Sequence, residues 1–251
     1  MKTDVVVVGA GPSGLIAAIE LAETGLSVIV LDEFYRPGGR LLGQLYEDPY
    51  LPKEAREWNG KEIATKLSEK AVERGVRIYT NTVVWSISGF FKIEVTGAIS
   101  GTIDAKAVLL STGSVEKGLP VPGWTLPGVI TIGAAQTLTN LHRIKVGKKV
   151  LIVGIDPLAL SVMVEMNKAG IEVARLVLPP QRHDLPFSYS PLEALERLEK
   201  VVHLAPNPIV RKFGRIGLER FKPLLMKTLY FDVLKSNGTK LSLRKALVAI
   251  E

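Results

Sequence analysis

The sequence predicts an α/β protein of two units, and three observations carry this prediction. The chain has 251 residues, which exceeds one typical domain. A β-branched run, a glycine-rich turn and a helical pattern follow one another at the N-terminus, and a similar order returns after residue 149. Strands that alternate with helices are typical of parallel sheets covered by helices.

The first unit begins with a strand, a helix and a second strand between residues 4 and 32. Val5 to Val8 is too short for a helix and wholly β-branched, which favours a parallel strand buried on both faces. Gly25 is expected to end the helix as its C-cap, and the second strand spans 28–31. The helix has apolar residues at helical spacing on its buried face: Leu15, Ala18, Ile19 and Ala22.

Gly9, Gly11 and Gly14 have the GxGxxG spacing of dinucleotide-binding turns. The first glycine permits a tight turn, the second lets a pyrophosphate approach the backbone, and the third lets helix and strand pack closely. Pro12 and Ser13 complete the turn, where N–H groups of the helix face the phosphates. The alternative is a glycine-rich turn without a ligand.

Asp32 ends the second strand, where an acid accepts hydrogen bonds from an adenosine ribose. Glu33 could take this role if the strand ends one residue later, and a plain surface aspartate is the alternative. The loop over 34–44 contains the pair Gly38 and Gly39, which suits a backbone that passes close to a large ligand. A loop without a ligand is again the alternative.

The remainder of the first unit is expected to be a helix followed by short strands. Apolar residues at helical spacing predict the helix over 60–74, with Gly75 as its cap. A strand over 76–79 follows, and a buried strand over 107–110 leads into Thr112 and Gly113. Between them, three alternating segments predict a three-stranded antiparallel β-meander, over 83–87, 90–95 and 99–103.

The second unit begins with a strand from Lys149 to Gly154, a helix over 158–169 and a strand over 173–178. Its fingerprint is damaged, because Asp156 stands where the middle glycine should be and its carboxylate would crowd and repel a pyrophosphate. Val177 lies near the position of the ribose acid and cannot accept a hydrogen bond. We therefore expect a Rossmann-like domain that has lost tight NAD(P) binding, with Gly154 as a structural turn.

The C-terminal part is expected to add a helix and further strands. The helix is predicted over 191–199 and a strand over 201–204. Antiparallel pairing is expected in the tail, and Asn237-Gly238 between alternating runs predicts a hairpin.

Composition excludes several function classes. Cys is absent, which removes disulfides, Cys-ligated zinc and iron–sulfur ligation, and the three histidines lack metal-ligand spacing. The net charge is +7, but Lys and Arg are spread along the chain, so no nucleic-acid partner is expected. No apolar run approaches the roughly 20 residues that cross a bilayer, and no leader sequence is recognised, which predicts a cytoplasmic protein.

The order of these motifs resembles the two-dinucleotide-domain flavoproteins, the family that contains the pyridine nucleotide-disulfide reductases. Within this family, the chain resembles the branch with hydrogen cyanide synthase, opine oxidase and amino-acid dehydrogenase subunits. This resemblance rests on the string Gly118-Leu-Pro-Val-Pro-Gly-Trp-Thr-Leu-Pro-Gly-Val129, followed by Gly133-Ala-Ala-Gln-Thr137. The resemblance covers essentially the whole chain. It implies an α/β fold of two Rossmann-like three-layer dinucleotide-binding domains, the first with an antiparallel β-meander. Residues 1–115 are then the FAD-binding domain and residues 116–251 the NAD(P)-type domain.

The same resemblance implies a set of FAD contacts. The pyrophosphate would lie at the three glycines of the first turn and the ribose at Asp32. Gly38, Gly39 and Arg40 would approach the rest of FAD. Val83 would contact the adenine through its backbone, and Thr112 and Gly113 would flank the cofactor. In this family a final Gly-Asp segment contacts the flavin, and none follows Glu251, which predicts a fragment, a site completed by another chain, or weak flavin binding.

The function implied is that of an FAD-dependent oxidoreductase, or of its flavin-binding subunit. It would transfer electrons from an amine or amino-acid substrate to an acceptor, with a partner subunit or as a homo-oligomer. The flavin carries the electrons, so no catalytic side chain is assigned. The alternative is a non-catalytic nucleotide-binding assembly subunit of a hetero-oligomeric dehydrogenase, which Asp156 and Val177 favour. An NAD(P)H-dependent flavin reductase is disfavoured by Asp156.

Overall fold

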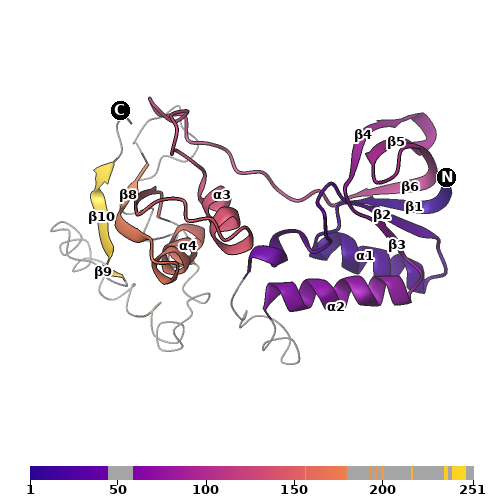
Figure 1. The fold of residues 1–251 in the computed structure, drawn as a ribbon, viewed down its shortest axis with the longest axis horizontal. Coiled ribbons are helices and arrows are strands. Elements are labelled where there is room, and N and C mark those ends of the chain that lie inside the picture. Colours follow the sequence, from indigo (N-terminus) through magenta and orange to yellow (C-terminus); the bar gives the residue numbers. More distant parts are fainter. Residues whose placement is uncertain are drawn as a thin grey trace. The chain divides into compact units, whose positions relative to one another are not determined.

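The computed structural model describes residues 1–44, 59–155 and 157–179, and in the C-terminal part residues 193, 196, 199, 200, 216, 235–236 and 239–246. The chain divides into two compact units, Met1–Val115 and Glu116–Glu251 (Figure 1). Asp156, the expected strand over 201–204 and most of the expected helix over 191–199 lie outside the described residues.

Unit 1 is built on a six-stranded sheet with the order β3-β2-β1-β6-β5-β4. Its parallel part consists of β1 (Lys2–Val8), β2 (Val28–Leu31), β3 (Arg77–Tyr79) and the second half of β6 (Gly101–Leu110). β5 (Lys92–Gly97) and β4 (Thr82–Ser88) continue the sheet in antiparallel pairing. β1 therefore lies inside the sheet, between β2 and β6.

The predicted meander is present, but its third strand differs from the expectation. The strands expected over 99–103 and 107–110 form one continuous strand, β6. Its first half pairs antiparallel with β5, and its second half pairs parallel with β1. The polar residues between the two apolar runs suggested a break, yet a neighbouring strand pairs with each half of the segment, and both β5 and β1 reach Asp104. β6 thus joins the meander to the parallel sheet.

Two helices and the meander cover opposite faces of the parallel strands. α1 (Pro12–Glu23) and α2 (Gly60–Glu73) lie on one face (Figure 1), where buried apolar residues of α1 and α2 pack against Val5, Val7, Val28 and Val30. On the other face, residues of β1 and β2 pack against the meander: Val6, Ile29 and Leu31 against Ile93, Val95 and Ile103. The centre of the β-branched run is thus buried on both sides, as predicted.

Both helices of unit 1 end where glycines predicted an end. Gly25 and Gly75 have φ of +88° and +82°, a conformation that glycine adopts without strain. α2 also begins with a capping box, because the Asn59 side chain accepts from the Glu62 N–H and the Glu62 carboxylate accepts from the Asn59 N–H. These local signals fix the length of each helix.

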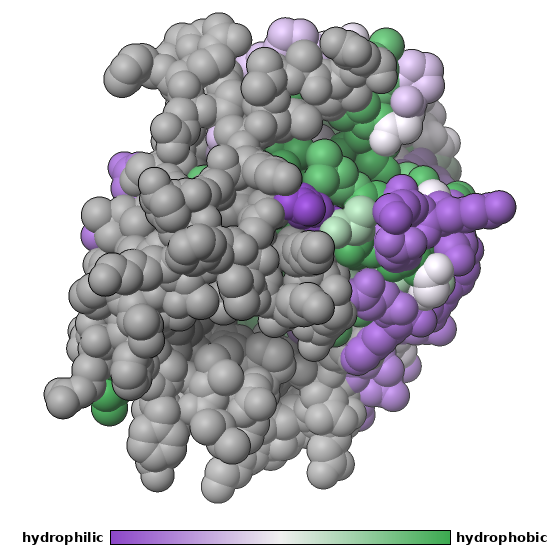
Figure 2. All heavy atoms as spheres, turned by 90° about the vertical axis from the view of Figure 1, so that its left-hand side faces the viewer, coloured by the Kyte–Doolittle hydropathy of each residue, from purple (hydrophilic) through white to green (hydrophobic). Residues whose placement is uncertain are grey.

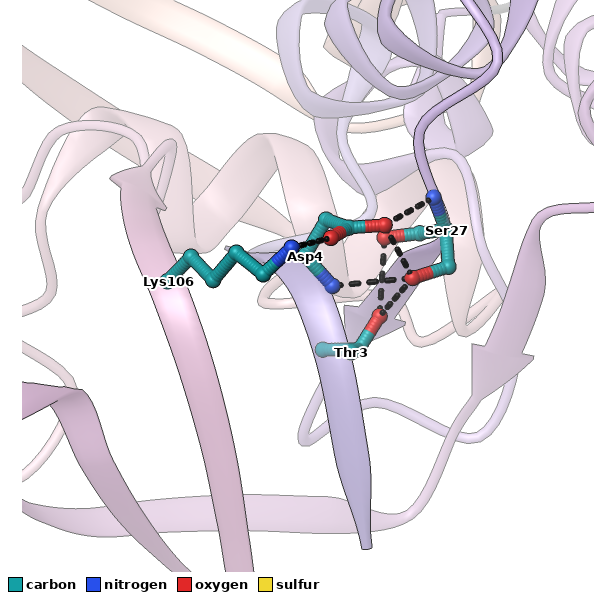
Figure 3. A network of polar contacts seen from close by, with 4 residues as sticks. All are labelled: Thr3, Asp4, Ser27 and Lys106. Carbon is teal, nitrogen blue, oxygen red and sulfur yellow. Dashed lines mark hydrogen bonds and ion pairs between the residues drawn. The ribbon is translucent and has the colours of Figure 1, made fainter.

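A polar network connects the N-terminal part of β1 with its neighbours (Figure 3). The Asp4 carboxylate accepts hydrogen bonds from the backbone and hydroxyl of Ser27 at 2.8 and 2.6 Å, and pairs with Lys106 Nζ at 2.7 Å. The Thr3 hydroxyl donates to the Ser27 carbonyl at 2.8 Å. The network joins β1, the residue before β2, and β6.

Unit 2 contains a four-stranded sheet with the order β7-β8-β10-β9. β7 (Lys149–Val153), α4 (Pro157–Lys168) and β8 (Glu172–Leu178) form the predicted strand-helix-strand order, and the two strands are parallel. β9 (Lys235–Ser236) and β10 (Thr239–Ala246) pair antiparallel on either side of residues 237–238, as the Asn-Gly signal predicted. The parallel pairing of β10 with β8 was not predicted.

The core of unit 2 forms where α4 packs on β7 and β8. Ile155, Val162, Met163 and Leu176 are among its fully buried residues. A short helix, α3 (Ile132–Gln136), and the π-helical turn Thr137–Leu141 pack beside α4, and the buried Glu165 carboxylate accepts from the Gln136 and Asn140 side chains. On the face shown in Figure 2, described hydrophobic side chains border a group of hydrophilic ones.

Candidate cofactor site

The expected cofactor residues of unit 1 lie at one edge of its sheet. Gly9 follows β1, Asp32 follows β2 and Ser111 follows β6, and these three strands are parallel neighbours. The C-terminal ends of parallel strands meet at one edge, which is where α/β sheets bind ligands. Residues far apart in the sequence are therefore brought together here by the strand order alone.

Gly9 and Gly14 are required by the packing of the turn itself. Gly9 has φ +106°, and a Cβ atom on it would collide with the Ser111 carbonyl oxygen. A Cβ atom on Gly14 would collide with the Gly9 carbonyl oxygen, so that α1 could no longer lie this close to the end of β1. The first and third glycines thus have the tight-turn and close-packing roles that the motif predicts.

Gly11 differs, because no close contact among the described residues requires glycine there. Its φ is −69°, which any residue adopts, and no atom of the described residues outside its own turn lies within 4 Å of the position of a Cβ atom. The turn therefore leaves open space beside the Gly11 backbone, at the N-terminus of α1. A pyrophosphate that approaches the backbone needs such space, so the residues of this turn fit a dinucleotide.

The N-terminus of α1 offers favourable electrostatics for an anion. Gly11 is the N-cap residue and contributes no capping side chain, and the first turn contains no acidic residue. The helix has 12 residues, so its backbone dipoles place partial positive charge at this end. Ser13 is exposed and Pro12 is half-buried within that turn.

Asp32 is bound to the glycine turn through its carboxylate. Oδ2 accepts from the Ala10 N–H at 2.6 Å, and Oδ1 accepts from the Phe34 N–H at 2.8 Å. β2 ends at Leu31, so the condition under which Glu33 would replace Asp32 is not met, and Glu33 is exposed. An ionised carboxylate accepts about four hydrogen bonds, so Asp32 retains acceptor capacity beyond these two.

The loop after β2 closes over the glycine turn. The Gly38 N–H donates to the Ala10 carbonyl at 2.8 Å, and a Cβ atom on Gly39 would lie 3.0 Å from Gly11 Cα. Glycine is needed at both positions, which have φ +125° and +54°. Residues 39–43 form a 3₁₀ turn within the segment expected to be an irregular loop. Arg40 donates to the Ser114 carbonyl at 2.9 Å, which links this loop to the segment after β6.

Ser111 is a site residue that sequence reasoning missed. Its hydroxyl lies 2.9 Å from the Gly9 carbonyl oxygen and 3.1 Å from that of Val8, so it braces the turn from β6. Thr112 and Gly113 follow it and are exposed at the same edge. The only signal in the sequence is a serine directly after a buried strand, which is too common to single out a residue.

Backbone hydrogen bonds at the start of β4 position Val83 near this edge. The Thr82 N–H donates to the Asp32 carbonyl at 2.9 Å, and the Asn81 N–H donates to the Phe34 carbonyl at 2.9 Å. Val83 itself pairs with Thr96 of β5, and its side chain is exposed. The start of β4 is thus held beside the residue expected to bind ribose.

At the corresponding edge of unit 2, neither Val177, the next-to-last residue of β8, nor Pro179, which follows the strand, could recognise a ribose. Gly154 has φ +114°, and its N–H donates to the Val177 carbonyl at 2.8 Å. Val177 is buried, and the residue that follows β8 is Pro179, also buried. Neither side chain accepts a hydrogen bond from a hydroxyl or pairs with a phosphate.

Other candidate sites receive no support from the described residues. They contain no group of His, Asp and Glu arranged to hold a metal ion, and His142 is exposed. His183 and His203 lie outside the described residues. Among the helices that the structure describes, none combines the length and apolar character needed to cross a membrane.

Comparison with known proteins places the chain in a family. The model of the pyridine nucleotide-disulphide oxidoreductases matches residues 3–200. This chain belongs to that family. Its members and the relatives of this chain are FAD-binding oxidoreductases, some of which also use NAD(P). The resemblance stated from the sequence is therefore confirmed.

Curated relatives are named as subunits of larger enzymes. An opine oxidase subunit from Agrobacterium tumefaciens (strain Ach5) is 33% identical over 182 residues, which cover 67% of this chain and 35% of that protein. Hydrogen cyanide synthase subunit HcnB of Pseudomonas aeruginosa is 30% identical over 177 residues, covering 67% of this chain and 37% of that protein. The chain thus spans little more than a third of the length of these relatives.

A solved structure supports the fold. The crystal structure of L-proline dehydrogenase from P. horikoshii superposes with a TM-score of 0.59 at 25% identity, over 72% of this chain and 36% of that chain. The predicted α/β class with Rossmann-like dinucleotide-binding architecture is confirmed.

Proposed function

We propose that unit 1 binds FAD at the edge formed by β1, β2 and β6, and that the chain is the flavin-binding part of an oxidoreductase. The observation that carries this proposal is Gly11, whose missing side chain no contact with the described residues requires. A glycine in open space at a helix N-terminus leaves room for a ligand that lies against the backbone.

The other residues of the edge fit the remaining parts of an adenine dinucleotide. The diphosphate would lie against the first turn of α1, from Gly11 through Pro12 and Ser13 to Gly14. The ribose hydroxyls would donate to the acceptor capacity that Asp32 retains. The adenine would lie by the backbone of Val83, and Gly39 and Arg40, with Thr112 and Gly113, would approach the rest of the cofactor.

Asp32 then acts twice. It holds the glycine turn through Ala10 before the cofactor arrives, and it binds the sugar afterwards. A site whose ligand-binding atoms are already in place loses less conformational entropy on binding, which favours affinity. The same carboxylate thus couples the shape of the turn to recognition of the ribose.

We infer the substrate class from the relatives. Their names describe oxidases of opines and a synthase of hydrogen cyanide, and the solved relative is a proline dehydrogenase, so an amine or amino acid is the proposed electron donor. Bound FAD would supply the two-electron acceptor. The residues of this chain bind and orient that cofactor, and a partner subunit or a second copy is proposed to complete the enzyme.

FAD titration tests the binding proposal. Apo protein is titrated with FAD while flavin fluorescence is followed, and NADH is titrated in parallel. We expect saturation at one FAD per chain, and no saturable binding of NADH, because unit 2 presents Val177 and Pro179 where a ribose acceptor is needed. A chain that gives no saturation with FAD would contradict the proposal.

A second candidate function rests on unit 2. Because Val177 and Pro179 stand where a ribose acceptor is needed, unit 2 could serve assembly, and the chain could be a non-catalytic nucleotide-binding subunit. The two functions differ in one measurement. If reduction of an acceptor dye by amines or amino acids, with or without a partner subunit, requires FAD bound to this chain, the catalytic function holds. Dye reduction by a partner subunit that proceeds equally without FAD in this chain would favour the assembly function.

A further inference from the structure

The first strand pair of the meander, β4 and β5, exposes an apolar surface that the proposed cofactor site does not use. We call it the β4 patch, and it consists of Trp85 and Ile87 of β4 with Phe90 and Phe91 of the following turn. Their exposed fractions are 65%, 41%, 97% and 44%. Four large apolar side chains within seven residues are more than the scattered single exposures normal for a protein surface.

The patch lies along the edge of the sheet. β4 is the last strand of the order β3-β2-β1-β6-β5-β4, so within this sheet it has a partner on one side only, β5. Edge strands of natural proteins are protected from pairing with other chains by charged residues, proline or β-bulges. β4 reads Thr-Val-Val-Trp-Ser-Ile-Ser, with neither a charged residue nor proline, and its register shift lies between Val84 and Ser86. Among the described residues, Ile87 and Ser88 beyond this shift have no strand on their outer side, so this end of β4 is open to a further strand.

A β-bulge directs the largest side chain of the patch. The pairing register shifts between Val84 and Ser86, which leaves Trp85 as the extra residue on β4. Bulges re-aim a side chain and recur where a strand has a role beyond pairing. Here the re-aimed side chain is a tryptophan that remains two-thirds exposed.

The turn beside β4 holds its phenylalanines at a conformational cost. Phe90 and Phe91 have φ of +52° and +50°, which is unfavourable for bulky residues and is normally left to Gly, Asn or Asp. The Phe90 ring stays exposed to water and so gains no burial on folding. Positive φ suits the twist of a hairpin turn, but the described core of unit 1 contains neither ring, which leaves both available for a contact outside it.

We propose that the β4 patch is an interface between two copies of this chain, in which the two β4 strands pair antiparallel about a twofold axis. A twofold contact brings the same surface together on both partners. Because β4 has no charged residue, two copies place no like charges opposite each other, which would otherwise oppose self-pairing. The proposal is independent of FAD binding.

The size of the patch agrees with the core of such an interface. Large apolar side chains bury about 150–250 Å² each when fully covered, so the exposed parts of these four supply roughly 500 Å². A standard interface takes about 800 Å² per partner. The free backbone edge of β4 and the polar residues around it would supply the remainder, as a rim around an aromatic centre.

The molar mass of the full chain in solution, measured by light scattering after size-exclusion chromatography with excess FAD, tests the proposal. We expect twice the chain mass of 27.3 kDa for the wild type and 27.3 kDa for Phe90→Asn and for Ile87→Lys. Asn tolerates positive φ, so Phe90→Asn removes the aromatic ring while relieving strain and should melt no lower than the wild type. Ile87→Lys places a charge on the edge, and we expect its dimer to dissociate at least tenfold more readily.

Val72→Gln is the matched control, because Val72 is 61% exposed on α2, outside the patch. It should remain dimeric. A wild type that stays monomeric at all soluble concentrations would overturn the proposal, including the case in which the chain associates only with a different protein. A dimer that persists in both patch variants would overturn it as well, since its interface would lie elsewhere.

Discussion

At the scale of single residues, the glycines of the first turn differ in whether contacts within the fold or a bound ligand would require them. Three glycines share one motif, yet close contacts require glycine at Gly9 and Gly14, whereas no contact among the described residues requires it at Gly11. The sequence predicts all three positions because their spacing is fixed by the strand–turn–helix geometry. It cannot predict Ser111, whose bond to the Gly9 carbonyl depends on the neighbouring strand β6.

Asp32→Asn tests the double role of that carboxylate. An amide presents one acceptor and one donor, so either the Ala10 or the Phe34 N–H would lose its partner. We expect the free energy of unfolding to fall by about 1–3 kcal/mol and the affinity for FAD to fall with it. Chemical denaturation and FAD titration measure the two effects.

Glu33→Gln provides the comparison for Asp32→Asn. Glu33 is exposed, so its substitution should change stability by no more than about 0.5 kcal/mol and leave FAD affinity unchanged. If Glu33→Gln weakened FAD binding more than Asp32→Asn, the assignment of the ribose to Asp32 would be wrong.

At the scale of elements, the polar network of β1, β2 and β6 makes stability depend on pH. Hydrogen bonding to Lys106 and Ser27 holds the pKa of the Asp4 carboxyl well below its usual range. A lowered pKa in the folded chain means that the carboxylate stabilises the fold above the ordinary pKa of about 3.9. This contribution is lost as the pH falls further, because the unfolded chain then binds a proton that the folded chain does not.

Asp4→Asn should therefore remove part of the acid sensitivity. We expect the melting temperature of the wild type to exceed that of Asp4→Asn at pH 6, and the difference to shrink steadily below about pH 4. Salt should reduce the difference at pH 6, because Lys106 is largely exposed and screening weakens the ion pair. Thermal melts across pH at two salt concentrations measure this, with Glu20→Gln as a control. A difference that does not change with pH would contradict the role of Asp4.

The elements themselves could be predicted where their signals are local. The start of α2, the ends of α1 and α2 and the strand β2 follow from caps, glycines and apolar spacing within a few residues. The continuity of β6 could not be predicted, because Asp104 and Lys106 interrupt its apolar pattern and only the neighbouring strands reveal it. The pairing of β10 with β8 likewise depends on residues far apart in the sequence.

At the scale of the whole molecule, the two units share an architecture but differ at the ligand edge. Unit 1 has an open glycine, an acid after β2 and a glycine pair that closes over the turn. Unit 2 has a glycine turn but a buried valine and a proline where the acid should be. Family membership was predictable from the motif order, whereas the substrate depends on residues that no local pattern identifies. The proposed cofactor therefore belongs to unit 1.

The affinity for FAD of Gly11→Ala, measured together with its melting temperature, tests this assignment most directly. Gly89→Ala is the matched control, because Gly89 also has open space around a Cβ position but lies in the meander turn. We predict that Gly89→Ala melts near the wild type and binds FAD normally. Gly11→Ala replaces a favoured N-cap residue, so it should melt slightly lower, and we predict that it binds FAD roughly 100-fold more weakly, a loss of about 2.7 kcal/mol. Unchanged FAD affinity in a folded Gly11→Ala protein would contradict the central claim that a diphosphate lies against this backbone.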